Sequence, residues 1–102
     1  MRVTSIERLT EFGRDHPDAR RALAAWLRTT TNARWRSLTD VRGTYPHADG
    51  VKVAGERTMT IFNIRGNNYR LLTTVDYQLS SVNVLQVLTH AQYDKEKWKG
   101  TL

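Results

Sequence analysis

Four polar side chains near the C-terminal end of the sequence have types and a spacing that suit proton transfer. They occupy positions i, i+3, i+4 and i+7 and are His90, Tyr93, Asp94 and Lys97. A helix over this segment places all four on one face. Imidazole and phenol groups can transfer protons, and the ordinary pKa of imidazole is close to neutral pH. The spacing therefore predicts a helical face suited to acid–base chemistry.

Two arginines precede this face in the chain. Arg65 falls at a turn, and Arg70 falls within an apolar run with strand character. A guanidinium group carries a permanent charge and a planar fork of donors that matches phosphate oxygens. Together with His90 and Tyr93, the arginines can bind a phosphodiester and move two protons without a metal ion. The combination indicates phosphodiester chemistry.

Each of these residues also fits an ordinary structural role. An arginine in a strand is commonly solvated or salt-bridged, and an arginine at a turn commonly contributes solubility. His90 can simply cap the helix, and Tyr93 can pack as a half-buried aromatic. Asp94 and Lys97 can form a surface ion pair of little energy.

Other kinds of site find little support in the sequence. Cysteine is absent, which excludes disulfides, thiolate metal sites and cysteine nucleophiles. The histidines His16, His47 and His90 include no pair at metal-ligand spacing. No HExxH, EF-hand, GxxxxGK[ST] or nucleophile-elbow pattern occurs. We therefore expect neither a metal nor a small-molecule cofactor.

Length and charge narrow the class of protein. The 102 residues are expected to form a single domain over 1–102. Sixteen Lys and Arg residues against ten Asp and Glu residues give a net charge of +6, which favours a polyanionic partner such as nucleic acid. No signal peptide and no run of about 18 apolar residues is present. We expect a cytoplasmic protein that does not act at a membrane.

The N-terminal third predicts a short edge strand over 1–5 and two helices. Thr4 and Glu7 stand at capping-box spacing for the first helix, which should end near Asp15 because Pro17 follows. The second helix starts there. Its buried face carries the apolar residues at helical spacing, which are Ala22, Leu23, Trp26 and Leu27.

The middle of the chain lacks clean periodicity. Residues 29–56 contain several glycines and a proline and predict a long, partly irregular connection. Within it, Trp35 and Val41 are expected to fill the core.

The following segment predicts a β-hairpin and a third strand. The runs TMTIFNI and YRLLTTVDY flank a turn over 65–68 and pair Ile64 with Tyr69 and Asn63 with Arg70. Alternation then puts Arg70 on the face opposite Tyr69. The run SVNVLQVLT predicts the third strand without fixing its register. A helix over THAQYDKEKW follows and begins with a capping box of Thr89 and Gln92.

The order of these segments resembles the HigB-type toxins of bacterial type II toxin–antitoxin systems, within the RelE-like group. The resemblance covers essentially the whole chain, and the pairing of FNIxGNxYRL with THAxYD about twenty residues later is its most specific part. The segments that carry it are MRVTS, EFGRDHPDARRALAAWL, FNIRGNNYRLLTTVDY and VLTHAQYDKEKW.

The resemblance implies an α+β fold with two N-terminal helices packed on a small, twisted, mainly antiparallel sheet, followed by a short C-terminal helix. It also implies an mRNA-cleaving endoribonuclease that acts on the translating ribosome. The implied partner is a HigA-like antitoxin that carries a helix-turn-helix.

Carried over residue by residue, the resemblance assigns catalysis to Arg70, His90, Tyr93 and Asp94. Several RelE-like toxins have a further arginine where this sequence has His90, so the general base stays open between His90 and Tyr93. Asn68 stands where many relatives have lysine. The residues expected to contact RNA are Arg65, Asn68, Lys97, Arg34 and Arg36.

Two other functions stay open on the sequence alone. The first is a non-catalytic basic module that binds RNA or DNA through arginines aligned with phosphates. The second is a ParE-like toxin that inhibits a topoisomerase.

Overall fold

The computed structural model of the chain describes residues 1–53, 55, 57–95 and 98–101. The elements in chain order are β1 (Arg2–Thr4), α1 (Glu7–Asp15), a 3₁₀ turn (Pro17–Ala19), α2 (Arg20–Asn32), α3 (Leu38–Thr44), β2 (Asp49–Lys52), β3 (Thr58–Ile64), β4 (Tyr69–Asp76), β5 (Ser81–Thr89), α4 (His90–Asp94) and α5 (Trp98–Thr101).

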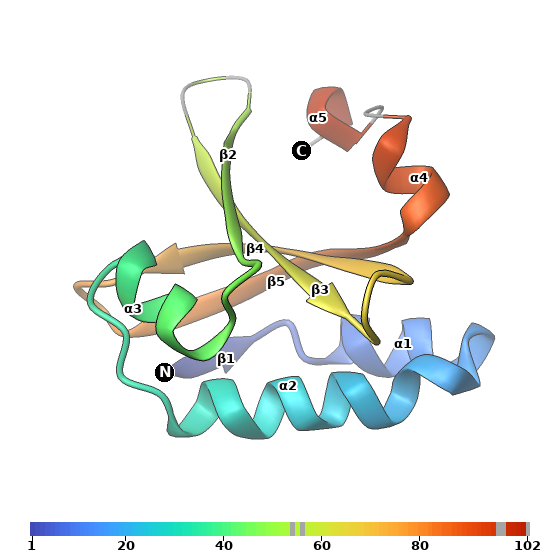
Figure 1. Cartoon of the computed structure of the whole chain (residues 1–102), viewed down its shortest axis with the longest axis horizontal. Helices are drawn as coiled ribbons and strands as arrows, with labels where there is room; N and C mark the ends of the chain where they lie inside the picture. Colours follow the sequence, from blue (N-terminus) through green and yellow to red (C-terminus); the bar gives the residue numbers. More distant parts are fainter. Residues whose placement is uncertain (54, 56, 96–97, 102) are drawn as a thin grey trace.

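Within these residues, five strands form one sheet in the order β1-β5-β4-β3-β2. Strand β1 runs parallel to β5, and the other neighbouring strands are antiparallel. Helices α1 and α2 lie along one side of the sheet, and α4 and α5 lie on the other (Figure 1). This arrangement confirms the α+β fold class predicted from the sequence.

The two N-terminal helices lie where the sequence predicts them. Helix α1 ends at Asp15, and Pro17 begins the 3₁₀ turn that leads into α2. Leu23 and Trp26 bury the inner face of α2, with exposed fractions of 3% and 2%. The periodicity of this segment was therefore sufficient to identify its buried face.

The predicted capping box at the start of α1 is wrong. Thr4 belongs to strand β1, and its hydroxyl donates to Asn83 Oδ1 at 2.8 Å. The N-cap position is Ile6, which makes no side-chain capping bond. Pairing of β1 with β5 takes Thr4 away from the helix, so a long-range contact overrides the local pattern.

The prediction of a long irregular connection over 29–56 is also wrong in part. Helix α2 continues to Asn32, and α3 and β2 follow within the range, whereas Glu56 lies outside the described residues. Elements of seven and four residues are too short to display a period. Trp35 and Val41 are buried as predicted, with 4% and 0% of their surfaces exposed.

The β3–β4 hairpin has the predicted register. Ile64 pairs with Tyr69, and Asn63 pairs with Arg70. The N–H of Asn68 donates to the carbonyl of Arg65 at 3.2 Å and closes the turn. Gly66 has a φ of +62°, a conformation that glycine adopts without steric cost.

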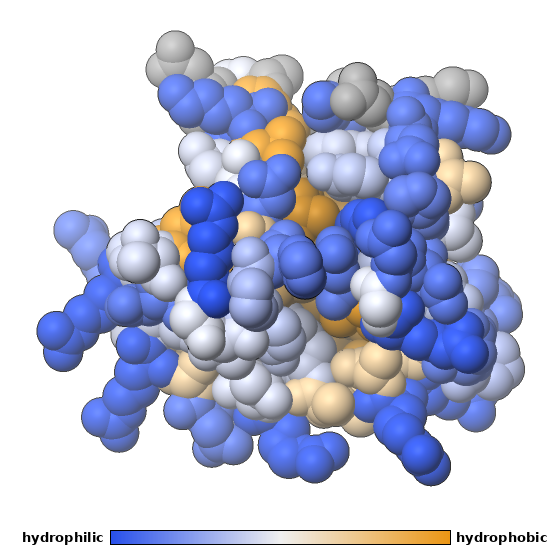
Figure 2. All heavy atoms as spheres, viewed as in Figure 1, coloured by the Kyte–Doolittle hydropathy of each residue, from blue (hydrophilic) through white to orange (hydrophobic). Residues whose placement is uncertain are grey.

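The two faces of the sheet contact different hydrophobic clusters. Tyr69 and Leu71 belong to the cluster that includes Leu23 and Trp26 of α2. Leu72 belongs to a second cluster with Trp98 of α5. Figure 2 shows apolar atoms of this second region in the notch between the β2–β3 arm and the C-terminal helices. By alternation, Arg70 lies on the side of α4 and α5.

Strand β5 contains a bulge that the sequence does not reveal. Leu72 pairs with Gln86 and Thr73 pairs with Val84, so Leu85 is an extra residue in the ladder. A guanidinium nitrogen of Arg8 in α1 donates to the carbonyl of Leu85. Val84 and Val87 both belong to the cluster that contains Leu23 and Trp26, which we call the helix-side cluster. In a regular strand, residues three positions apart face opposite sides, so the bulge is what places both valines on the same side.

Two leucines provide a direct test of where the core lies. Leu71 is 0% exposed, whereas Leu79 is 75% exposed. We expect Leu71→Ala to lower the free energy of unfolding by about 2–5 kcal/mol, because it leaves a cavity in the core. Leu79→Ala should change it by less than about 0.5 kcal/mol. Urea denaturation measures both values, and equal losses would contradict this description of the core.

Candidate active site

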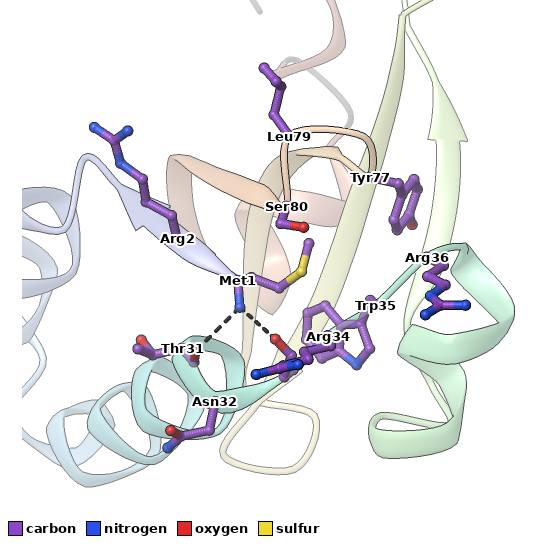
Figure 3. A pocket seen from close by; sticks show the side chains of 11 residues that line it. Met1, Arg2, Thr31, Asn32, Arg34, Trp35, Arg36, Tyr77, Leu79 and Ser80 are labelled. Atoms are coloured by element: carbon purple, nitrogen blue, oxygen red, sulfur yellow. Dashed lines mark hydrogen bonds between the residues drawn. The ribbon is translucent and has the colours of Figure 1, made fainter.

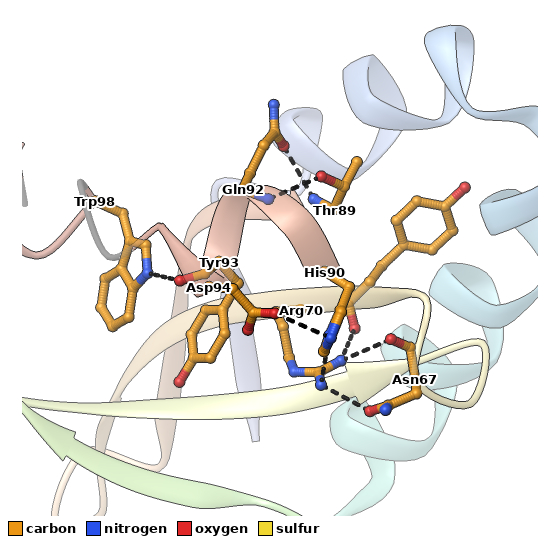
Figure 4. Close-up of polar contacts among 9 residues, drawn as sticks. Asn67, Arg70, Thr89, His90, Gln92, Tyr93, Asp94 and Trp98 are labelled. Carbon is orange, nitrogen blue, oxygen red and sulfur yellow. Dashed lines mark hydrogen bonds and ion pairs between the residues drawn. The ribbon is translucent and has the colours of Figure 1, made fainter.

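The side chain of Arg70 lies at the centre of the polar cluster (Figure 4). The residue is 9% exposed, and within the described chain its guanidinium makes four hydrogen bonds. Nη1 donates to the carbonyls of Asn67 and Tyr69 at 3.1 and 3.2 Å. Nη2 donates to Asn67 Oδ1 at 2.7 Å and to His90 Nδ1 at 3.1 Å. These contacts hold a cation against the end of the sheet.

The start of helix α4 positions His90. Thr89 and Gln92 form the predicted capping box, in which Gln92 N–H donates to Thr89 Oγ1 and Thr89 N–H donates to Gln92 Oε1. The N–H of His90 donates to the carbonyl of Asn68 at 3.0 Å. The helix therefore begins against the hairpin turn, which brings His90 beside Arg70.

The contacts of His90 define its tautomer. A guanidinium group has no acceptor, so Nδ1 must accept the hydrogen bond from Arg70. The ring proton then lies on Nε2, which is 3.1 Å from Asp94 Oδ2. The His90 and Asp94 side chains are about half exposed, at 48% and 59%. The structure thus aligns Arg70, His90 and Asp94 in one chain of polar contacts that reaches solvent.

Tyr93 lies on the other side of the Arg70 guanidinium from the hairpin turn. The Arg70 Cζ atom is 5.6 Å from the centre of the Tyr93 ring, within cation–π distance. Trp98 stacks on Tyr93 with a centroid separation of 5.0 Å, and its Nε1 donates to the Tyr93 carbonyl at 2.9 Å. The predicted residues Arg70, His90, Tyr93 and Asp94 are therefore brought together.

Asn67 is part of this cluster, although its residue type and spacing did not predict a site residue. Its carbonyl and its side-chain oxygen both accept from Arg70. The sequence feature that could have identified Asn67 is its position three residues before Arg70, at the tip of the hairpin. Asn68 contributes its carbonyl to His90, and its side chain is exposed. Lys97 lies outside the described residues.

Arg65 points away from Arg70, toward the N-terminal helices. Its Nη1 is 2.9 Å from Asp18 Oδ2, and Tyr69 Oη donates to the same oxygen at 2.7 Å. The hydrogen bond from Tyr69, aided by the Arg65 cation, lowers the pKa of the Asp18 carboxyl group. The same hydrogen bond raises the pKa of the Tyr69 phenol. This contact fastens the hairpin to the helices.

Arg34 and Arg36 belong to the connection between α2 and α3. This connection lies across the molecule from α4 (Figure 1). The two arginines line a pocket with Arg2, Tyr77 and other residues near the start of β1 (Figure 3). The structure therefore does not bring these two arginines to the Arg70 cluster.

The cluster places a cation in contact with an imidazole and beside the ring of a tyrosine, which are groups that can bind a phosphate and transfer protons. Among the described residues, no group of three or more His, Asp or Glu side chains is placed to hold a metal ion. No helix in the described part of the chain is long and apolar enough to span a membrane.

Residues 19–96 match the family model of the HigB toxin, described as the RelE-like toxic component of a toxin–antitoxin system. The chain belongs to this family. The matched segment contains Arg70, His90, Tyr93 and Asp94. No curated protein matches the chain. Membership in the HigB toxin family makes the protein a toxin of a toxin–antitoxin system and implies an antitoxin partner.

The contact between Tyr69 and Asp18 predicts a pH-dependent contribution to the stability of this toxin. Because the pKa of Asp18 is lowered, its contribution is present above about pH 4 and is lost as the pH falls through the lowered pKa. Because the pKa of Tyr69 is raised, its contribution is present below about pH 10 and is lost as the pH rises through the raised pKa.

Substitution of Tyr69→Phe should therefore reduce the free energy of unfolding most between about pH 5 and pH 9, with a smaller difference from wild type at either extreme. Tyr45→Phe serves as the control, because Tyr45 packs in the helix-side cluster without this contact to Asp18. Urea denaturation over a pH series measures the effect. Wild-type and Tyr69→Phe stability curves that run parallel across the whole range would refute the prediction.

Proposed function

We propose that this HigB-family toxin is an endoribonuclease that cleaves mRNA through attack by the ribose 2′-hydroxyl. The observation that carries the proposal is the direct contact of Arg70 with His90, at the end of the sheet where His90 faces Asp94. RNA supplies its own nucleophile, so the enzyme has to position the phosphate, move protons and stabilise charge. The cluster contains a group for each of these tasks.

In the proposed reaction, His90 is the general base. The phosphate draws an Arg70 N–H away from His90 Nδ1, and the freed lone pair accepts the 2′-hydroxyl proton. Asp94 faces the opposite ring nitrogen at 3.1 Å and stabilises the resulting imidazolium. A carboxylate in this position also holds the ring in the tautomer that a base requires.

Arg70 stabilises the phosphate as negative charge develops on its oxygens. As the O2′–P bond forms, the P–O5′ bond breaks, and Tyr93 gives its phenolic proton to the leaving O5′. The products are a 2′,3′-cyclic phosphate and a 5′-hydroxyl end. Once the N–H has passed from His90 to the phosphate, the remaining bonds to Asn67 and Tyr69 hold the guanidinium, so the cation does not have to reorient as charge develops.

The biological setting follows from the same proposal. The net charge of +6 favours RNA as the partner. We infer that the toxin acts in the cytoplasm on mRNA bound to the translating ribosome and is neutralised by a HigA-like antitoxin with a helix-turn-helix. Family membership supports the antitoxin, and the net positive charge supports the RNA.

Removal of the Arg70 guanidinium tests the mechanism. We expect Arg70→Ala to slow RNA cleavage by about 100- to 1,000-fold, because one transition-state contact of this kind contributes about 3–4 kcal/mol. Arg70→Lys keeps the charge but loses the planar fork, so it should recover only part of the rate. The measurement is the appearance of new 5′ ends in cellular mRNA after induction.

The control is Arg28→Ala, which removes an exposed arginine from α2. It should leave cleavage unchanged, and thermal melting of each purified variant shows whether the fold is intact. New 5′ ends at the wild-type level from a folded Arg70→Ala protein would remove Arg70 from the mechanism. If the wild-type protein itself produces no new ends, the toxin is not an mRNA endonuclease.

A further inference from the structure

A second polar surface lies beside the Arg70 cluster. It is a hollow of about 540 Å³ lined by His47, Asn63, Gly66 and Asn67. His47 comes from the connection between α3 and β2, and the other three residues come from β3 and the hairpin turn. The hollow therefore lies between two segments. One is the α3–β2 connection, within the range predicted to be irregular, and the other is the hairpin turn that supports Arg70.

Two of the lining residues neighbour Arg70 directly. Asn63 is its cross-strand partner, so both side chains project from the same face of the sheet. Asn67 accepts a hydrogen bond from Arg70 Nη2 through its side-chain oxygen. A nucleotide whose phosphate contacts Arg70 consequently has this hollow within reach of an adjacent base.

Apart from His47, the lining consists of Gly66 and two asparagines, whose side chains are uncharged and can form hydrogen bonds. Asn67 uses its side-chain oxygen for Arg70, which leaves the amide N–H groups as donors. The half-buried side chain of Asn63 makes no hydrogen bond within the described residues and offers both a donor and an acceptor. An amide side chain carries a donor and an acceptor side by side, which match the paired donors and acceptors of base edges.

His47 adds a planar group at the rim. The residue is exposed, and its ring makes no hydrogen bond to the described part of the chain. Unpaired bases in single-stranded RNA stack on histidine and aromatic side chains, while neighbouring polar groups bond their edges. Together, the three side chains provide one group on which a base can stack and two groups that can form hydrogen bonds with the edge of that base.

We propose that this hollow binds the base next to the scissile phosphate and selects which RNA sequences are cut. Asn63 and Asn67 contact the edge of the base, and His47 stacks on its face. The inference rests on the proposed RNA cleavage and adds the residues that determine its sequence preference.

Two substitutions test the hollow without altering the catalytic cluster. His47→Ala removes the stacking surface, and Asn63→Leu removes the edge contacts at similar volume. Gln78→Ala is the matched control, because it removes an exposed, neutral, hydrogen-bonding side chain beyond the far end of β4. After induction, the new 5′ ends of cellular mRNA are mapped, and base frequencies on each side of the cut are compared with those of the wild type.

We expect His47→Ala and Asn63→Leu each to reduce the preference at one position flanking the cut by about tenfold, while cleavage continues. Gln78→Ala should keep the wild-type base frequencies. Circular dichroism melting confirms that each variant is folded.

Unchanged base frequencies in both variants would overturn this inference and leave the proposed nuclease intact. A folded His47→Ala protein that produces no new ends would also overturn it, by assigning His47 to the chemical step. An absence of new ends from the wild type would remove the proposed function and this inference together.

Discussion

The structure of the polar cluster depends on the need to satisfy one buried cation. A guanidinium withdrawn from water is costly unless acceptors replace the lost hydration. Arg70 finds these acceptors on Asn67, Tyr69 and His90, which belong to the hairpin turn, its own strand and the start of α4. One group therefore joins the hairpin turn, strand β4 and helix α4.

Strand β4 connects this cluster to the stability of the molecule. Tyr69 and Arg70 are adjacent in the chain but project from opposite faces of the sheet. Tyr69 reaches Asp18 beside the N-terminal helices, while Arg70 reaches His90. The hairpin turn is thus held from both sides. Arg65 takes part in the contact on the helix side, because its guanidinium pairs with Asp18. Its side chain therefore points away from the Arg70 guanidinium.

The sequence was most informative where structure depends on short-range patterns. The hairpin register followed from the turn length, and the capping box at Thr89 followed from spacing. The same capping pattern failed at Thr4, because pairing with β5 was a stronger constraint. The partner of Arg65 was not predictable, since Asp18 lies 47 positions away. Asn67 was missed because an asparagine at a turn already has a backbone explanation.

The extra residue at Leu85 gives strand β5 one residue more than its ladder with β4 requires. Beyond the bulge, Val87 turns toward the helices and Leu88 toward the second cluster, and the strand then delivers Thr89 to the start of α4. Without Leu85, Val84 and Gln86 would be adjacent and would oppose Thr73 and Leu72 in a regular ladder, so Val87 and Leu88 would keep their orientations. A single-codon deletion at this point therefore removes the bulge and its contact with Arg8 but leaves the closing helix correctly directed, whereas the same deletion in an unbulged part of the strand has no extra residue to absorb it.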